Sequence, residues 1–197
     1  MSQVFNIENF QAITGRKIKE DGTTVNVADT ISGGSFLVTS NAGEPSVSQT
    51  RPDNTTAYTA LDVVGTDPAS NIEFTSVLPI AGADFVIMGA SLRVDVGAKP
   101  AGMDGFRLHL YNAAPTAIVD NAPFNIPSAD RSKYLGYITL TTPTDFGDTL
   151  YGQTDNINFK RKLAVGSTSL FGILETITGF TPTAEAVKTV TLHIVGV

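Results

Sequence analysis

The chain has 197 residues, of which 42% are hydrophobic and 16% are charged, and it contains two His but no Cys and no Trp. The absence of Cys excludes disulfide frameworks, Cys-ligated zinc, iron–sulfur clusters and thiol nucleophiles, and two His leave little for multi-His metal sites. The net charge of −6 provides no basic footprint for nucleic acid or anionic lipid, so we expect neither as a partner.

The residue usage favours strands and turns over helices. The chain carries 25 Thr, 18 Gly and 10 Pro, and Thr is enriched in strands while Gly and Pro end them. No stretch approaches the roughly 18 uninterrupted apolar residues of a membrane span, and the N-terminus lacks the pattern of a secretory signal. We therefore expect a soluble, β-rich protein that is made in the cytoplasm.

Residues 1–50 differ from the rest of the chain in the spacing of their apolar residues. Their apolar bursts are brief and widely spaced, as at Val4-Phe5, 25–27 and 36–38. Such bursts fit short edge strands or an extended segment better than an independent core. We predict an N-terminal arm or small added subdomain over 1–50 and a β-sandwich domain over 51–197.

From residue 51 onward, strand signals recur between turn residues. The segment 106–111 alternates strictly, with Phe106, Leu108 and Leu110 on one face. Asp155-Asn156 has the residue types of a tight hairpin turn between two strands. The strands that we predict cover residues 55–64, 71–74, 84–96, 106–111, 134–140, 150–154, 157–163, 170–176 and 188–195.

About nine short strands without a helical period define the fold class. Their spacing and turn residues predict an all-β β-sandwich, and a jelly roll is a form that fits. The chain has no internal repeat of 20 to 50 residues, which disfavours propellers and solenoids.

The two imidazoles, His109 and His193, lie on the polar or second face of alternating strands. Either could bind a metal or transfer a proton. The simpler interpretation, which we favour, is a half-exposed strand residue that makes ordinary hydrogen bonds.

Four carboxylates fall in predicted loops, namely Asp120, Asp130, Asp145 and Asp148. A pair at a defined separation could perform acid/base glycoside hydrolysis, but no spacing here fixes such a pair. Turn formation explains these Asp residues better. We therefore predict no catalytic, cofactor-binding or metal-binding residues, no cofactor and no enzymatic activity.

Two further groups have both a structural and a functional interpretation. The basic cluster Lys160-Arg161-Lys162 could meet an acidic protein, but a solvated edge that discourages aggregation is the commoner role. Exposed aromatic rings could bind sugars, but Trp is absent and four Tyr have structural roles in or beside strands: Tyr111, Tyr134, Tyr137 and Tyr151.

Several short sequence segments resemble those of one group of virus proteins: RPDNTTAY at 51–58, FRLHLYN at 106–112, YLGYI at 134–138 and TLHIV at 191–195. Together they resemble structural proteins of tailed bacteriophages of the capsid decoration, or cement, type. The resemblance covers about three quarters of the chain. It implies a virion protein on the outside of an icosahedral head, with the major capsid protein as partner and a homotrimer as assembly.

Two alternatives to this interpretation remain open. The first is a host-receptor or glycan-binding β-sandwich of a phage tail or fibre, which exposed aromatic platforms would support. The second is a polysaccharide-cleaving enzyme, which would need two close carboxylates in a pocket.

Overall fold

The computed structural model describes residues 16–18, 24–26 and 42–197 of the chain. The chain divides into two units, 1–39 and 40–197. In the first unit, β1 (Arg16–Ile18) and β2 (Thr24–Asn26) form an antiparallel pair. The apolar bursts Val4-Phe5 and 36–38 of the predicted arm lie outside the described residues.

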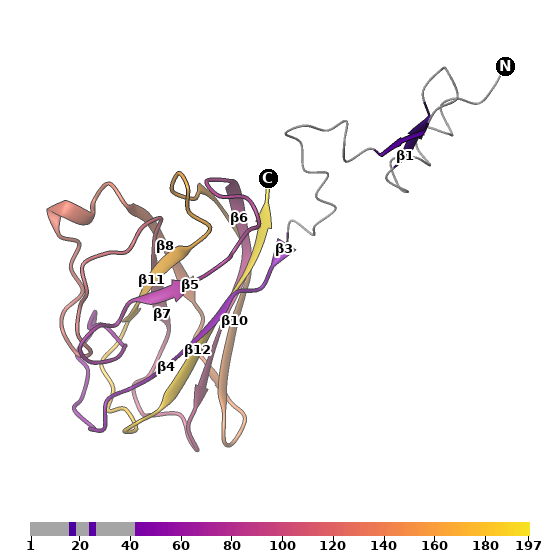
Figure 1. Ribbon diagram of the computed structural model, residues 1–197. Helices are drawn as coiled ribbons and strands as arrows, with labels where there is room; N and C mark the ends of the chain where they lie inside the picture. Colours follow the sequence, from indigo (N-terminus) through magenta and orange to yellow (C-terminus); the bar gives the residue numbers. More distant parts are fainter. Residues whose placement is uncertain (1–15, 19–23, 27–41) are drawn as a thin grey trace. The chain divides into compact units, whose positions relative to one another are not determined.

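The second unit consists of two antiparallel sheets that face each other (Figure 1). One sheet has the order β3-β12-β6-β10-β9, with β4 also paired to β12, and the other has the order β5-β11-β7-β8. The long β7–β8 connection contains the short 3-10 helix η1 (Ser128–Asp130). The strands are β3 (Ala42–Gly43), β4 (Ser46–Thr50), β5 (Ile72–Phe74), β6 (Asp84–Asp95), β7 (Phe106–Tyr111), β8 (Tyr134–Leu140), β9 (Thr144–Asp145), β10 (Leu150–Lys162), β11 (Leu170–Thr176) and β12 (Val187–Gly196).

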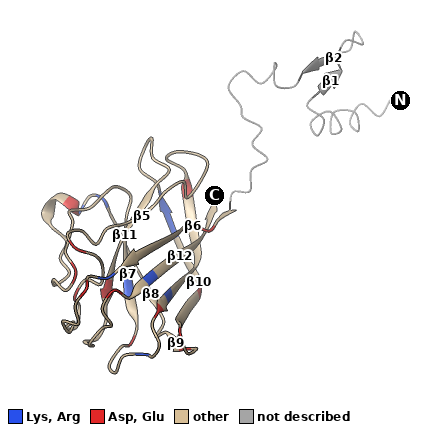
Figure 2. Cartoon of the chain, turned by 60° about the horizontal axis from the view of Figure 1, so that its bottom comes forward, with Lys and Arg blue, Asp and Glu red and all other residues tan. Residues whose placement is uncertain are grey.

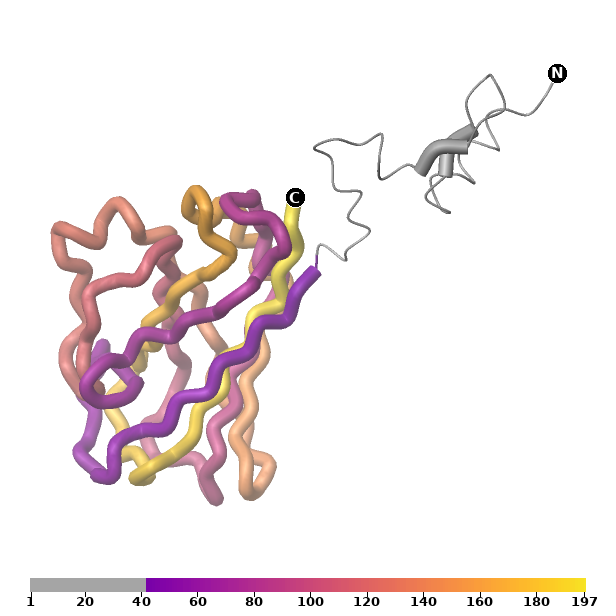
Figure 3. The backbone as a smooth tube through the Cα atoms, in the orientation of Figure 1, coloured from indigo at the N-terminus to yellow at the C-terminus, as the bar shows by residue number. Residues whose placement is uncertain are grey.

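The strand pairing identifies the sandwich as a jelly roll. Four antiparallel pairs join the first half of the domain to the second half in reverse order, namely β4 with β12, β5 with β11, β6 with β10, and β7 with β8. Rolling this long double ribbon then brings β12 against β6 and β11 against β7. Figure 3 shows the pair of β4 and β12, with β4 in indigo beside the yellow β12. The eight strands of these four pairs, four in the six-stranded sheet and four in the four-stranded sheet, are connected as in a jelly roll, which confirms the predicted fold class.

The core fills the space between the two sheets. Alternate residues of each strand point inward, as the period of two requires, so that Val190, Leu192 and Ile194 of β12 are buried as predicted. Removing a side chain such as Leu192 from water contributes about 1.5–3 kcal/mol. One continuous apolar cluster includes Phe85, Ile87, Leu92, Phe106, Leu108, Leu110, Leu174 and Leu192.

The predicted hairpin at Asp155-Asn156 is wrong. Residues 150–162 form one strand, β10, whose register against β6 shifts between Asp155 and Phe159. Asn156 and Asn158 do adopt positive φ angles of 57° and 50°. The left-handed conformation that these residue types tolerate therefore serves a bulge inside a strand, where the chain bends without reversing.

The strand predicted at 55–64 is also wrong, since this segment makes only two isolated bridges, at Asp62 and Val63. Its backbone amides bond instead to scattered partners, as when Tyr58 N donates to Phe180 O and Val64 N donates to Leu174 O. The segment is therefore a loop held by the end of the sandwich.

The first strands of the sandwich precede the predicted boundary at residue 50. β4 pairs with β12 along its whole length, from Ser46 opposite Thr191 to Thr50 opposite Val187. Residues 46–50 therefore supply one strand of the first sheet, and the domain starts before residue 51.

Candidate functional site

The outer side of the first sheet carries a grid of short hydroxyl side chains, here called the hydroxyl face: Ser46 and Ser48 of β4, Thr189 and Thr191 of β12, and Ser91 of β6, which is itself buried. The register places Ser46, Thr191 and Ser91 in one row across three strands, and Ser48 and Thr189 in the next. Hydroxyl pairs lie 2.9 Å apart at Ser46–Thr191 and 2.8 Å apart at Ser48–Thr189. The hydroxyl groups of these two pairs are thus held in place before any partner arrives.

Larger polar side chains border the hydroxyl face on β6 and β10. Arg93 lies opposite Tyr151 in the register, and Tyr151 is 38% exposed. Arg93 Nε also lies 3.0 Å from an oxygen of Asp95. Tyr151 donates to Gln153, and Gln153 donates to Asp155, at 3.1 and 2.8 Å. Arg93 and Tyr151 are of the residue types that supply most binding energy at protein interfaces.

His193 lies at one end of the same sheet face. Its Nδ1 is 3.2 Å from a carboxylate oxygen of Glu44, and its side chain is 35% exposed. This matches the predicted half-exposed strand residue with ordinary hydrogen bonds.

His109 differs from the prediction because it is buried, with 5% of its surface exposed. The Phe124 ring, from the loop 112–133, stacks on the imidazole with a centroid separation of 3.7 Å. His109 Nε2 lies 2.9 Å from Glu175, and Nδ1 lies 3.0 Å from the Tyr134 hydroxyl. A long loop that folds back over the outer side of the second sheet therefore encloses a residue that strand alternation places outside.

Burial lowers the pKa of His109, because the charged imidazolium loses its water. The hydrogen bond and negative charge of Glu175 oppose this shift, while the nearby Arg107 adds to it. The cluster therefore attaches the loop to the sheet through a neutral imidazole.

Three of the four loop carboxylates have structural partners. The Asp145 carboxylate accepts hydrogen bonds from the backbone amides of Lys99 and Gly147 at 2.8 and 2.9 Å, as is typical of an Asp in a turn. Asp130 is buried and accepts from the Thr116 amide and the Lys133 ammonium, and these hydrogen bonds lower its pKa to about 2. Asp120 belongs to the network described next.

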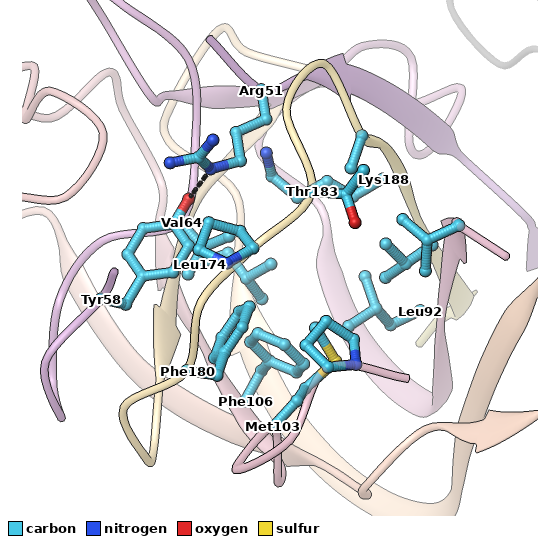
Figure 4. Close-up of a pocket in the computed structure, with 15 residues that line it drawn as sticks. Arg51, Tyr58, Val64, Leu92, Met103, Phe106, Leu174, Phe180, Thr183 and Lys188 are labelled. Carbon is cyan, nitrogen blue, oxygen red and sulfur yellow. Dashed lines mark hydrogen bonds between the residues drawn. The ribbon is translucent and has the colours of Figure 1, made fainter. Parts of the chain in front are cut away.

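A buried polar network, of which Figure 4 shows Arg51, Tyr58 and Lys188, lies at one end of the sandwich, and none of its members was predicted as a functional residue. The Asp120 carboxylate accepts from the Tyr58 hydroxyl at 2.6 Å and from the Gly65 amide at 2.9 Å, and it lies 3.5 Å from the Arg51 guanidinium. Lys188 is 5% exposed and donates to Gly65 O at 2.8 Å. The sequence did hold one indication that Lys188 is buried. In the alternating pattern of β12, Lys188 falls at the same positions as the inward-facing residues.

The remaining candidates lie at separate places. Arg161 stacks over the Phe159 ring at 4.1 Å and donates to Leu135 O, while Lys160 and Lys162 are exposed. Tyr137 is 51% exposed on the second sheet. Charged side chains are scattered along the ribbon with long uncharged stretches between them (Figure 2). In the described part of the chain, no cluster of His, Asp and Glu is suited to hold a metal ion, and no helix is long and apolar enough to span a membrane.

Comparison with known proteins gives weak similarities only. No family model and no curated protein matches the chain. Among solved structures, it is similar to a chain of the native virion of Kashmir bee virus, with 13% identity over 92% of this chain and 89% of that chain and a TM-score of 0.28. It is also similar to a chain of deformed wing virus, a honeybee pathogen, with 8% identity over 92% of this chain and 56% of that chain and a TM-score of 0.31. A chain of Israel acute paralysis virus is 15% identical over 89% of this chain and 85% of that chain, with a TM-score of 0.30. Identities and TM-scores this low carry no argument about function, and the fold assignment rests on the strand pairing.

Proposed function

We propose that this protein is a structural virion protein that decorates the outside of a phage head and stabilises contacts between neighbouring capsid subunits. The hydroxyl face, with Arg93 and Tyr151 at its border, is the observation that supports this role. The resemblance of the chain to decoration proteins motivates the choice of partner, which is the major capsid protein.

Side chains that become ordered at an interface lose conformational entropy. Immobilising a side chain with many rotamers costs about 0.5–1.5 kcal/mol on binding. Ser and Thr have few rotamers, and the hydroxyl pairs of Ser46–Thr191 and Ser48–Thr189 are already formed. The hydroxyl face therefore loses little entropy when a partner covers it.

A decoration protein can use contacts that are individually weak. A trimer, the assembly that we propose, would present three copies of the hydroxyl face to a lattice of repeated subunits, and multivalency raises the overall affinity far above that of one contact. We assign a second contact with a neighbouring capsid subunit to the N-terminal arm that the sequence predicts over residues 1–50.

Removing the protein from the virion tests this function. Particles assembled without it should lose infectivity faster on heating than complete particles, because contacts between subunits are missing, and they should adsorb to host cells normally. Normal heat stability with failed adsorption would instead support a receptor- or glycan-binding module. Release of reducing sugars from host polysaccharide by the purified protein would support an enzyme.

A matched pair of variants tests the proposed contact surface. Tyr151→Ala removes an aromatic ring at the border of the hydroxyl face, and Tyr137→Ala removes a similarly exposed ring from the other sheet. An interface aromatic of this kind contributes about 2 kcal/mol, so Tyr151→Ala should weaken binding to undecorated heads by about 30-fold. Tyr137→Ala should bind as the unmodified protein does. Equal affinities of both variants in a cosedimentation assay would contradict this assignment.

A further inference from the structure

Strand β4 lies at one edge of the first sheet, where β12 is the one described strand that pairs with it. In an antiparallel pair, residues whose backbone groups bond to the partner strand alternate with residues whose backbone groups point away from it. The position that follows β4 bonds to β12, because Arg51 N donates to Ala186 O. The alternation therefore turns the N–H and C=O groups of Ser46, Ser48 and Thr50 away from β12.

These outward backbone groups form an open row along the edge. Ser46, Ser48 and Thr50 are exposed, and the part of the chain that the structure describes offers no hydrogen-bond partner to their N–H and C=O groups. A row of unpaired N–H and C=O groups at a sheet edge is a template for pairing with another strand.

The other edges of the two sheets carry features that prevent such pairing, namely charge, bulges and short length. The part of β10 beyond β9 carries Lys160, Arg161 and Lys162. β8 contains Gly136 at a φ of 119° and a register shift against β7. β5 and β9 have three and two residues. β4, in contrast, has five residues of sequence SVSQT, without a charge, a Gly or a Pro.

We propose that β4 pairs with β4 of a second copy of this chain, antiparallel, across a two-fold axis at Ser48. In this register Ser48 lies opposite the second copy's Ser48, and Ser46 lies opposite its Thr50. Every outward N–H then meets an outward C=O. The side chains that face each other are short and uncharged, so no like charges meet.

The symmetry of β4 about Ser48 favours a second copy over a strand of another protein. A two-fold contact uses the same surface on both copies, so this surface has to be complementary to itself. The two first sheets would join into one sheet, with both hydroxyl faces on the same side. This contact is separate from the capsid and trimer contacts proposed above, and the purified protein alone can test it.

Disulfide cross-linking tests the register directly, because the chain contains no Cys and each introduced thiol reports one contact. In Ser48→Cys the two Cα atoms would lie about 5.5 Å apart across the axis, which suits a disulfide. Ser46→Cys is the matched control, since Ser46 is also exposed on the hydroxyl face. Its two copies would lie roughly 14 Å apart, four residues along the strand.

Under a mild oxidant, Ser48→Cys should form covalent dimers about tenfold faster than Ser46→Cys. Adding Thr50→Cys to Ser46→Cys should restore dimer formation, because these two positions face each other. Equal rates for the two single variants, or no dimer from either, would overturn the proposal and favour a strand of another protein at this edge. Failure of Thr50→Cys to restore the dimer would also overturn it.

Substitutions at Ser48 test whether the backbone makes the contact. Ser48→Pro removes one outward N–H but no bond to β12, and Pro is tolerated at an edge where its N–H would face solvent. In the Ser46→Cys/Thr50→Cys protein, adding Ser48→Pro should slow dimer formation about tenfold, whereas Ser48→Ala should leave the rate unchanged. An unchanged rate in a folded Ser48→Pro protein, or an equal loss with Ser48→Ala, would overturn the proposal. The comparison of the Cys variants holds even if Ser48→Pro does not fold.

Discussion

Replacement of Arg51 by Met tests whether the buried network holds the end of the sandwich together. Arg51 is 3% exposed, and its guanidinium donates to the Tyr58 hydroxyl at 2.8 Å and lies 3.5 Å from Asp120. Met preserves much of the side-chain volume but none of these interactions. The variant therefore removes the charge with little change in packing.

The size of the effect follows from what the change leaves behind. Removing one partner of a buried ion pair costs about 3–5 kcal/mol, because the other charge stays buried. Asp120 keeps its hydrogen bonds from Tyr58 and Gly65 and its attraction to the buried Lys188, which places the expected loss near the lower end, at about 3 kcal/mol. For a domain of this size, that loss corresponds to a decrease in Tm of about 6–12 °C.

Thermal and urea unfolding followed by circular dichroism measures this loss, with Arg93→Met as the matched control. Arg93 pairs with Asp95 at 3.0 Å, but both side chains are at least 40% exposed, so its replacement should cost less than about 1 kcal/mol. A cost of Arg51→Met no larger than that of Arg93→Met would refute this reasoning.

Two further predictions concern pH and backbone packing. Because burial lowers the pKa of His109 below its usual 6.5, its contribution to stability is fully present above about pH 6.5 and is lost as the pH falls through the lower folded-state pKa. Unfolding free energies measured between pH 7 and pH 5 should therefore fall less steeply in His109→Gln than in His193→Gln, and equal slopes would contradict this. Gly152→Ala should lose about 1–3 kcal/mol, because the new Cβ would lie 2.9 Å from Thr141 O, while Gly97→Ala, with nothing within 4 Å, should unfold at an unchanged urea concentration.

The sequence predicted those parts of the fold that depend on local pattern. Strands β7, β8 and β11 have the predicted bounds, because alternation of apolar and polar residues between turn residues is a local property. Asp155-Asn156 misled the prediction because the same residue types serve turns and bulges. Only the pairing of β10 with β6 on both sides of the bulge distinguishes the two.

The features of the candidate sites depend on contacts between distant parts of the chain. Phe124 encloses His109 because a long loop packs back on the sheet, and nothing in the local pattern around His109 indicates this. The partners of Lys188 come from a loop more than a hundred residues earlier. Strand alternation could have placed Lys188 inside the sandwich, but its role depends on Arg51 and Asp120, which only the folded structure brings near it.

A cryo-electron microscopy reconstruction of the complete virion tests the proposed function most directly. We predict jelly-roll density on the outside of the head, with the hydroxyl face and Tyr151 against the capsid subunits. Density for this domain on the tail, or on the head with the hydroxyl face turned to solvent, would contradict it.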